Sequence, residues 1–500
     1  MTENENRPRV YRIDETDTVA VALCPISCGE TVAVGQYTVT VMQPIPAGHK
    51  LAIKPMKSGD RIVKYGNPIG RALQDIPAGY HVHSHNMCTE LSGALRYTYT
   101  PDFRDLPQQK PLLFPGYRRA DGTVGIRNEI WIIPTVGCVN AVVREIETRA
   151  QAYLCSAIDG IYAYEHPYGC SQLGGDMDRT LHFLAGLIRH PNAAGVLVVG
   201  LGCENGNIGE LKRTLGNYDE TRVRFLNCQD VTDETAEGVS LVRELCRMAE
   251  CCRREPCPVS ALTVGLKCGG SDGFSGITAN PLLGAFSDRL TAMGGGVLLT
   301  EVPEMFGAEA ILMRRCRTKK QFDETVSLIN GFKAYFQRYG EKTGENPSPG
   351  NKEGGITTLE EKSLGCVQKG GTAPVEDVLC YGEPVQTRGL SLLQAPGNDL
   401  VASGALVASG AQIVLFTTGR GTPFGCPVPT VKVSSNTALY ERKPAWIDFD
   451  AGCLLNGADK SETLDRFFQL VLDIAAGAQR TKSEQLDKHA LAIFKDGVTL

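Results

Sequence analysis

The fold of this chain is decided by Glu129–Cys138, EIWIIPTVGC, with the two segments that follow it, residues 140–154 (NAVVREIETRAQAYL) and 158–170 (IDGIYAYEHPYGC). The first segment is a short apolar run typical of a buried strand, and the second repeats its apolar residues at helical spacing. The third predicts another strand. A strand, a helix and a strand in this order predict parallel strands joined by a right-handed crossover, so the region is of the α/β class.

The same alternation continues toward the carboxyl end of the chain. The break at residues 253–258, RREPCP, ends a predicted helix because proline cannot continue it, and it is the best domain boundary in this half. The predicted elements are strands at 194–205 and 223–229, strand-and-turn segments at 261–276, 295–307, 389–399 and 413–423, and helices at 140–154, 180–191, 235–252, 321–340 and 464–479.

Residues 10–88 have a different pattern, with short segments that alternate apolar and polar residues between Gly, Pro and Asp turns. This pattern predicts a small β domain. A polar stretch with several prolines, 101–115, then predicts a linker. We therefore expect three domains, at 1–106, 107–256 and 257–500: a β-rich domain followed by two Rossmann-like α/β domains with parallel sheets.

Composition narrows the class of function. Net charge is −5 at pH 7 with 21% charged residues, which argues against nucleic acid or an anionic membrane as the main partner. No apolar run reaches the ~18–20 residues of a membrane span. The polar N-terminus resembles no targeting segment, so we expect a cytoplasmic protein whose 18 cysteines are thiols. The absence of P-loop and dinucleotide motifs argues against an ATP or nicotinamide enzyme.

Three predicted strands of the middle region end in Gly-Cys, at Cys138, Cys170 and Cys203. Cysteine often packs as a small buried hydrophobe, but the polar end of a strand is a poor place for one. Ligands in open α/β sheets bind at the carboxyl ends of strands. Converging thiolates there would bind a soft metal, or an iron–sulfur cluster with one open iron site.

Histidines supply a second candidate centre. His81, His83 and His85 alternate along the chain, which in a strand places all three on one face. Isolated histidines are commonly surface residues, but three at this spacing favour contact with a metal or substrate. Glu165 and His166 follow a predicted strand and are a candidate acid–base pair.

Charged residues follow the strands of the last region, among them Asp272, Glu304 and Arg420. Singly, such residues are more often caps or turn residues. Residues 345–371 show no clear periodicity and carry Lys352 and Lys369. A polar loop of this length is usually functional or disordered, and its Gly, Lys and Cys content favours function.

Several long segments together carry a family resemblance. They are residues 62–70 (IVKYGNPIG), 81–86 (HVHSHN), 118–140 (RRADGTVGIRNEIWIIPTVGCVN), 168–176 (YGCSQLGGD), 268–281 (CGGSDGFSGITANP), 299–309 (LTEVPEMFGAE), 346–371 (NPSPGNKEGGITTLEEKSLGCVQKGG) and 416–425 (FTTGRGTPFG). On these segments the chain resembles the altronate/galactarate dehydratase family over nearly its whole length.

The resemblance implies an N-terminal SAF-type domain, a second domain and a larger C-terminal domain. It also implies dehydration of D-altronate to 2-dehydro-3-deoxy-D-gluconate, in the breakdown of hexuronates. The family is regarded as dependent on Fe²⁺, with Mn²⁺ as a substitute. The resemblance supplies no catalytic assignments, so the residue roles below are inferences from chemistry.

Removal of water from a 2,3-dihydroxy acid needs a base, an acid for the leaving hydroxyl, and stabilisation of the charge that develops beside the carboxylate. We expect the 345–371 loop to close over a bound sugar acid. The predicted catalytic residues are His83, His85, His166 and Glu304; the predicted metal ligands are His83, His85 and Asp272; the predicted substrate contacts are Lys352, Lys369, Arg420, Asn398 and Ser271.

Three alternatives stay open. The chain could dehydrate galactarate or another aldarate or aldonate, or bind a sugar acid without catalysis. It could also be an iron–sulfur hydro-lyase that uses Cys138, Cys170 and Cys203. A homodimer or larger assembly is a further expectation, because small β domains often need a partner surface.

Overall fold

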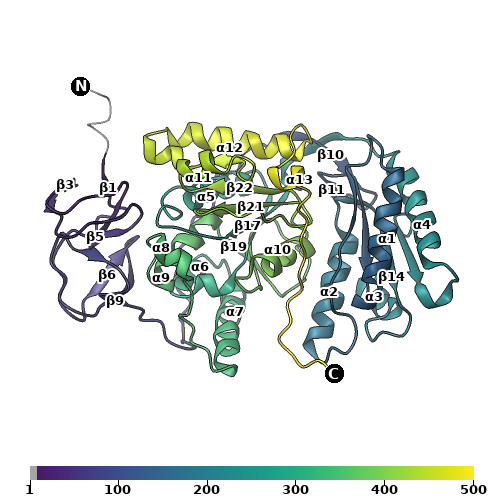
Figure 1. Ribbon diagram of the computed structural model, residues 1–500, viewed down its shortest axis with the longest axis horizontal. Helices are drawn as coiled ribbons and strands as arrows, with labels where there is room; N and C mark the ends of the chain where they lie inside the picture. The colour runs from purple at the N-terminus through teal and green to yellow at the C-terminus, as the bar shows by residue number, and fades with distance from the viewer. Residues whose placement is uncertain (1–7) are drawn as a thin grey trace.

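The computed structural model describes residues 8–500 as three bodies arranged along its longest axis (Figure 1). The N-terminal β domain lies at one end, the α/β domain built from the middle of the chain lies at the other, and the C-terminal α/β domain lies between them. The first seven residues of the first predicted domain lie outside the described residues. The C-terminal domain therefore contacts both of the others.

The N-terminal domain consists of three small antiparallel sheets, in the orders β1-β2-β5-β8, β3-β4 and β6-β7-β9. Along β3 exposed and buried residues alternate, as expected for a strand with one face on the core. The strands are β1 (Val10–Tyr11), β2 (Val19–Ala22), β3 (Thr31–Val34), β4 (Tyr37–Thr40), β5 (Lys50–Ala52), β6 (Arg61–Lys64), β7 (Asn67–Ala72), β8 (His81–Val82) and β9 (Met87–Cys88).

Residues 89–112 cross the C-terminal domain without forming a helix or strand, and Tyr97 there donates a hydrogen bond of 2.6 Å to Glu309. β10 (Leu113–Arg118) then pairs antiparallel with β11 (Val124–Gly125) in a hairpin. On its other edge β10 pairs with β16 (Glu255–Pro258). The predicted break at 253–258 thus contains the strand β16, which pairs with β10 at the end of the predicted linker.

The second domain is a parallel sheet in the order β13-β12-β14-β15, which confirms the α/β prediction. Two separate cores flank the sheet, with α1 and α4 packed together on one and α2 and α3 on the other. Its elements are β12 (Glu129–Pro134), α1 (Asn140–Ala150), β13 (Gly160–Ala163), α2 (Gly175–Arg189), β14 (Ala193–Gly200), α3 (Ile208–Leu215), β15 (Val223–Asn227) and α4 (Glu234–Ala249).

The C-terminal domain contains a seven-stranded parallel sheet in the order β19-β20-β18-β17-β21-β22-β23. Its strands are β17 (Thr263–Cys268), β18 (Gly296–Leu299), β19 (Val375–Leu379), β20 (Gly389–Leu393), β21 (Ile413–Thr418), β22 (Thr430–Ser434) and β23 (Phe449–Asp450). Its helices are α5 (Ala279–Ala292), α6 (Glu309–Arg314), α7 (Lys319–Arg338), α8 (Pro349–Glu353), α9 (Leu359–Cys366), α10 (Asp399–Ala408), α11 (Thr437–Arg442), α12 (Lys460–Ala475) and α13 (Lys482–Gln485).

The segment 345–371, expected to be a loop, contains the short helices α8 and α9. The side chains of Ser348 and Thr358 cap these helices by accepting backbone N–H groups. All eight residues of α9 are buried, polar ones included. Because α9 has no solvent face, its sequence lacks the alternation of polar and apolar residues that would have predicted it.

One apolar core runs from the N-terminal domain into the C-terminal domain, and it includes Ile62, Ile69 and Leu364. The N-terminal domain is therefore packed on its neighbour and not merely tethered to it. Within residues 8–500, no helix combines the length and apolarity needed to cross a membrane.

Candidate active site

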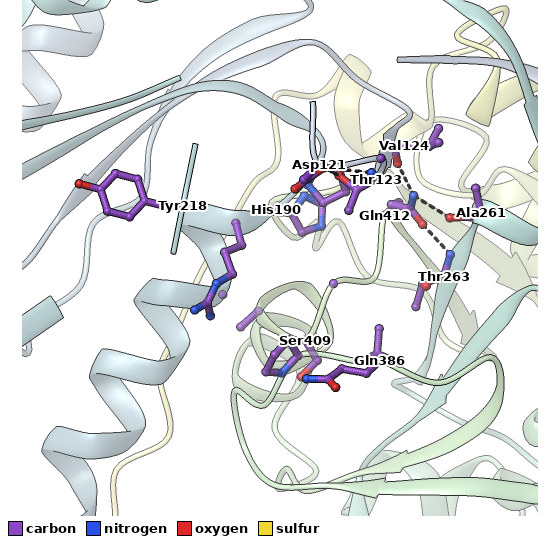
Figure 2. Close-up of a pocket in the computed structure, with 18 of the residues that line it drawn as sticks. Asp121, Thr123, Val124, His190, Tyr218, Ala261, Thr263, Gln386, Ser409 and Gln412 are labelled. Carbon is purple, nitrogen blue, oxygen red and sulfur yellow. Dashed lines mark hydrogen bonds between the residues drawn. The ribbon is translucent and has the colours of Figure 1, made fainter. Parts of the chain in front are cut away.

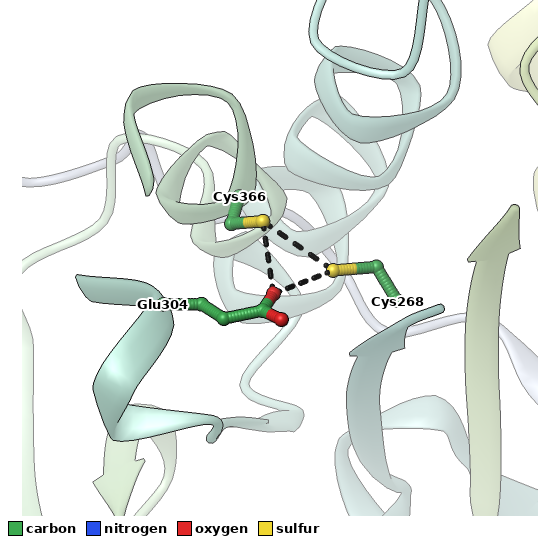
Figure 3. A group of neighbouring side chains, drawn as sticks. All are labelled: Cys268, Glu304 and Cys366. Atoms are coloured by element: carbon green, nitrogen blue, oxygen red, sulfur yellow. Dashed lines mark hydrogen bonds between the residues drawn. The ribbon is translucent and has the colours of Figure 1, made fainter. Parts of the chain in front are cut away.

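A buried polar centre lies where β17 and β18 of the C-terminal sheet end (Figure 3). Cys268 is the last residue of β17, and its Sγ lies 3.4 Å from Cys366 Sγ at the end of α9. Both thiols donate to Glu304 Oε2 at 3.2 Å. This cluster joins three segments that are distant in the sequence.

Lysines and carboxylates surround the two thiols. Lys369 Nζ lies 2.9 Å from Cys268 Sγ and 3.0 Å from Glu301, while Lys362 Nζ lies 2.8 Å from Glu304 Oε1. Burial opposes charge on Glu304, but the neighbouring lysines outweigh it and hold the pKa of that carboxyl below its usual value. The hydrogen bond to Cys268 and burial raise the pKa of Cys366, so this thiol stays protonated.

The charge network continues toward solvent. Lys267 pairs with Glu301 and, at 2.8 Å, with Asp399, whose side chain is 35% exposed. Glu301 has a left-handed backbone (φ 68°), an uncommon conformation for a residue with a side chain. With Lys369, Lys362 and Glu304, the network holds three ammonium groups and three carboxylates, so it is balanced while both thiols are neutral.

Histidines form a second cluster, between the N-terminal domain and α8. Antiparallel pairing of β5 with β8 sets Leu51 opposite His81, which brings His49 beside His83. Their rings stack with centroids 5.1 Å apart, and the His85 ring lies 5.5 Å from that of His81. His49 Nδ1 and His81 Nε2 are 3.0 Å apart. The prediction that these imidazoles gather is confirmed.

The reason given for that gathering was only partly right. β8 ends at Val82, so His83 and His85 lie in a turn and not on one face of a strand. Asn86 shapes the turn, since its side-chain oxygen accepts the His83 N–H at 2.9 Å and its amide donates to His81 O.

Burial favours the neutral imidazole in His49, His81 and His83 by lowering the pKa of each. It lowers the pKa of His81 to about 3 and that of His83 to about 4, with neighbouring positive charges adding to the effect. Two backbone carbonyls of α8 orient the rings: His83 Nε2 lies 2.9 Å from Lys352 O, and His49 Nε2 lies 3.1 Å from Glu353 O. A neutral, oriented imidazole can accept a proton or bind a metal.

A buried ion triad fixes the N-terminal domain to the segment 345–371. Lys50 and Lys64 each contact a different oxygen of Glu361 at 2.8 Å, and all three side chains are at most 1% exposed. Lys50 also donates to Gly355 O and to Thr357 Oγ1 at 2.8 Å. This triad holds the histidine cluster against α8.

Two of the possible metal sites differ in how well they suit a divalent ion. Cys268, Glu304 and Cys366 are the one group among residues 8–500 whose ligand atoms all lie within 4.8 Å. A metal there would require two thiols to lose protons and Lys369 to leave Cys268. The histidines are already neutral, so they fit a divalent metal better by donor chemistry.

The predicted residues are distributed over these clusters unevenly. Glu304 and Lys369 lie in the buried polar centre, and His83 and His85 lie in the histidine cluster. Asp272 accepts hydrogen bonds from Ser275, Ser435 and Asn436. Those contacts hold the turn after β17, and the metal role proposed for Asp272 stays a prediction.

The predicted substrate contacts lie in separate segments of the C-terminal domain. Arg420 is exposed after β21 and pairs with Glu353 at 3.0 Å, and Lys352 lies on α8. Asn398 caps α10. The Ser271 hydroxyl is buried and has no hydrogen-bond partner, which leaves it available to a ligand. Their roles toward substrate stay predictions.

His166 lies in another domain, apart from the other predicted catalytic residues. Its Nε2 lies 2.8 Å from Pro134 O and its Nδ1 accepts the Tyr168 N–H at 3.2 Å. Both ring nitrogens of this buried side chain are thus engaged with backbone. Cys138, Cys170 and Cys203 lie in the same domain and are exposed.

Sequence reasoning missed several residues of these clusters, namely His49, Lys50, Glu361 and Cys366 as partners of the predicted ones. A signal for His49 was available: Ile45–His49 (IPAGH) and Ile76–His81 (IPAGYH) repeat the same turn. Equivalent turns in a small β domain place the residues that follow them at related positions.

The cavity of Figure 2 lies elsewhere, between the second and C-terminal domains, with a volume of about 610 Å³. His190, Thr263 and Gln412 in its wall stand at or just before the amino ends of parallel strands. Ligands of such sheets bind at the carboxyl ends, so this cavity is on the wrong edge for the active site.

Three family models match successive parts of the chain. They describe an altronate/galactarate dehydratase SAF domain (residues 8–90), a D-galactarate dehydratase/altronate hydrolase second domain (116–250) and a D-galactarate/altronate dehydratase C-terminal domain (259–499). Fold and matches together define a hydro-lyase with an SAF domain. The predicted boundaries after residues 106 and 256 fall between the matched ranges and stay predictions.

Comparison with curated proteins narrows this class. The chain is 52% identical to altronate dehydratase of Bacillus subtilis (98% of this chain, 99% of the relative) and 51% identical to altronate dehydratase of Escherichia coli (98% and 99%). It is 32% identical to galactarate dehydratase (L-threo-forming) of Escherichia coli (97% and 96%). The chain belongs to the altronate/galactarate dehydratase family.

Proposed function

We propose that the protein dehydrates D-altronate to 2-dehydro-3-deoxy-D-gluconate. The observation that carries the proposal is identity above 50% to two altronate dehydratases over 98% of the chain, against 32% to a galactarate dehydratase. The dihydroxy acid loses its C2 proton and C3 hydroxyl, and the resulting enol becomes the 2-keto acid. No electrons are gained or lost, so no redox cofactor is required.

The histidine cluster supports the proton transfer. Because burial lowers the pKa of His83 to about 4, its imidazole is neutral near pH 7 and can accept a proton. His85 is exposed, and its ring lies against that of His81 in the same cluster. In our proposal one of these two, His83 or His85, exchanges protons with C2 and with the leaving hydroxyl.

Cationic side chains support binding of the substrate carboxylate. Arg420 offers a planar guanidinium whose only ion pair, among the described residues, is the exposed one with Glu353. Lys352 follows the Ser348 cap on α8, next to the carbonyls that orient His49 and His83. A sugar acid bound between Arg420 and Lys352 would therefore meet the histidines.

The cofactor proposed for this site is Fe²⁺, with Mn²⁺ as the alternative. Whichever of His83 and His85 does not transfer the proton would hold the ion, with His81 and His49 beside it. When bound, a divalent metal supplies Lewis acidity that stabilises negative charge on the carboxylate and the leaving oxygen.

A substrate panel tests the proposal. The protein, purified without oxygen and supplied with Fe²⁺, is incubated with D-altronate, galactarate and other aldonates, and the 2-keto acid product is measured. We expect turnover of D-altronate and a loss of about 10²-fold or more in His83→Ala and His85→Ala. Turnover of galactarate alone would support the second candidate, which the 32% relative favours. Binding of acids without any product would support a non-catalytic protein.

Location and assembly are also proposals. A cytoplasmic location is supported by 18 free cysteines, with no disulfide among residues 8–500. A homo-oligomer is proposed on the general ground that small β domains often need a partner surface. Size measurement by light scattering tests the assembly.

A further inference from the structure

Three exposed thiols project from one edge of the second domain's sheet. Cys138 follows β12, Cys170 follows β13 and Cys203 follows β14. In the parallel register Pro134 pairs with Val199, and Cys138 and Cys203 each follow their paired residue by four positions. Neighbouring strands are about 4.8 Å apart, so the loops that carry these two cysteines leave adjacent strand ends.

Hydrogen bonds tie the three loops to one another in every pair. Gly137 N–H donates to Tyr168 O at 2.9 Å, which joins the first loop to the second. Gly206 N–H donates to Gly169 O at 2.9 Å, which joins the third loop to the second. Thr135 Oγ1 donates to Glu204 in the third loop. The loops that carry the thiols thus form one packed unit.

Glycine permits this close approach. Gly169 has φ +99°, and a Cβ at this position would lie 1.9 Å from Thr135 O. Any side chain there would push the second loop away from the first, so glycine directly before Cys170 is a steric requirement. His166, whose ring bridges Pro134 O and the Tyr168 N–H, holds the same loop from inside.

Helix amino ends and polar side chains lie around the three loops. The three loops lead into the amino ends of α1, α2 and α3, where partial positive charge stabilises anions. Cys170 Sγ lies 3.5 Å from Asn205 Oδ1, and Gln229 Nε2 lies 3.6 Å from Cys203 Sγ. All three thiols are exposed to solvent, so an incoming iron or sulfide ion can reach them.

The spacing of the thiols discriminates between one ion and a cluster. Two sulfurs bound to one zinc ion at about 2.3 Å each can be at most about 4.6 Å apart. Among residues 8–500, no group of three or more His, Cys, Asp or Glu side chains that contains these cysteines brings its ligand atoms within 4.8 Å of one another. A single ion would therefore need the side chains to approach one another, whereas a cluster of several irons spans a wider set of ligands.

We propose that Cys138, Cys170 and Cys203 hold an iron–sulfur cluster of the [4Fe–4S] type, with one iron that has no protein thiolate. The cluster would lie at the exposed edge of the second domain, and its open iron could bind an oxygen ligand such as water, a hydroxyl or a carboxylate. The proposal concerns a second metal centre and does not depend on which sugar acid the protein dehydrates.

Anaerobic reconstitution of the full chain with Fe²⁺ and sulfide tests this proposal, with readouts that are independent of turnover. We expect about four irons and four acid-labile sulfides per chain after desalting, a broad visible absorption, and a Mössbauer spectrum with one distinct iron site. Cys138→Ala, Cys170→Ala and Cys203→Ala should each lose most of the sulfide.

Cys251→Ala is the matched control, because Cys251 is an exposed cysteine of the same domain just after α4. It should retain iron and sulfide at the level of the unaltered protein. Circular dichroism of each variant separates loss of the cluster from loss of the fold. The proposal is overturned if reconstituted protein holds no sulfide, or if the triple alanine variant holds as much as the control. A disulfide among the three cysteines in protein prepared without oxygen would also overturn it.

Discussion

The two parallel sheets of this molecule both end in cysteines, and the two edges have opposite environments. Cys138, Cys170 and Cys203 are exposed at the edge of the second domain's sheet. Cys268 and Cys366 are buried at the edge of the C-terminal sheet, between lysines and carboxylates. The same Gly-Cys or Cys-Gly pattern in the sequence thus gives an accessible site in one domain and an enclosed network in the other.

The difference comes from what covers each edge. α9 contributes Cys366 to the C-terminal edge, and the N-terminal domain holds α9 in place through Lys50, Lys64 and Glu361. The thiols of the second domain have no such cover in the described structure. A strand end therefore becomes buried or accessible through segments that are distant in sequence, which the local pattern does not encode.

Disrupting the contacts that hold α9 at the edge of the C-terminal sheet should have the largest effect on the difference between the two sheet edges. Glu361→Gln preserves the shape of the side chain but leaves two buried ammonium groups without a carboxylate. Removal of one partner from a buried ion pair costs about 3–5 kcal/mol, so we expect the free energy of unfolding to fall by that amount in urea denaturation. Cys366 should then react faster with a thiol reagent.

Glu353→Gln is the control, since it removes an exposed ion pair with Arg420 whose loss costs about 1 kcal/mol or less. If Glu361→Gln is no less stable than this control, the ion triad does not hold α9 in place. If the free energy of unfolding falls but Cys366 reacts with the thiol reagent no faster, α9 is held in place by the apolar core that the two domains share.

Alanine substitution of one cysteine at each sheet edge compares the buried and the exposed environment directly. Cys366→Ala removes a buried donor to Glu304 and leaves space, which should lower the free energy of unfolding by about 1–3 kcal/mol. Cys203→Ala, in protein free of iron, should change it by less than about 0.5 kcal/mol, because an exposed side chain packs little. Equal effects in urea denaturation would contradict the assigned environments.

Much of the fold followed from periodicity. Between residues 129 and 249 the four strands and the helices α1, α2 and α4 were predicted because each buries one face or is wholly apolar, whereas the short helix α3 was not predicted. α9 was not predicted because its polar residues, Glu361 and Lys362 among them, contact charged protein groups instead of water. Periodicity reports contact with water, so it fails for a helix surrounded by protein.

Less of the candidate site followed from the sequence. The histidine cluster was predicted because three of its members are close along the chain, while His49 joins only through the pairing of β5 with β8. Cys268 and Cys366 meet within the C-terminal domain, and no local spacing predicts a contact between residues 98 positions apart. Site residues recruited by tertiary packing require the structure.

A last expected effect is a pH dependence of stability that comes from the histidine cluster beside α8. Unfolding restores ordinary pKa values near 6.5 to His81 and His83, whereas the fold holds them at about 3 and about 4. Between pH 6.5 and pH 4 the unfolded chain therefore binds more protons, so stability should fall as pH falls through this window. The same denaturation series with His83→Gln should show a shallower fall, while His182→Gln, exposed on α2, should follow the unaltered protein. Identical slopes in all three proteins would show that the histidine cluster does not remain neutral in the folded state.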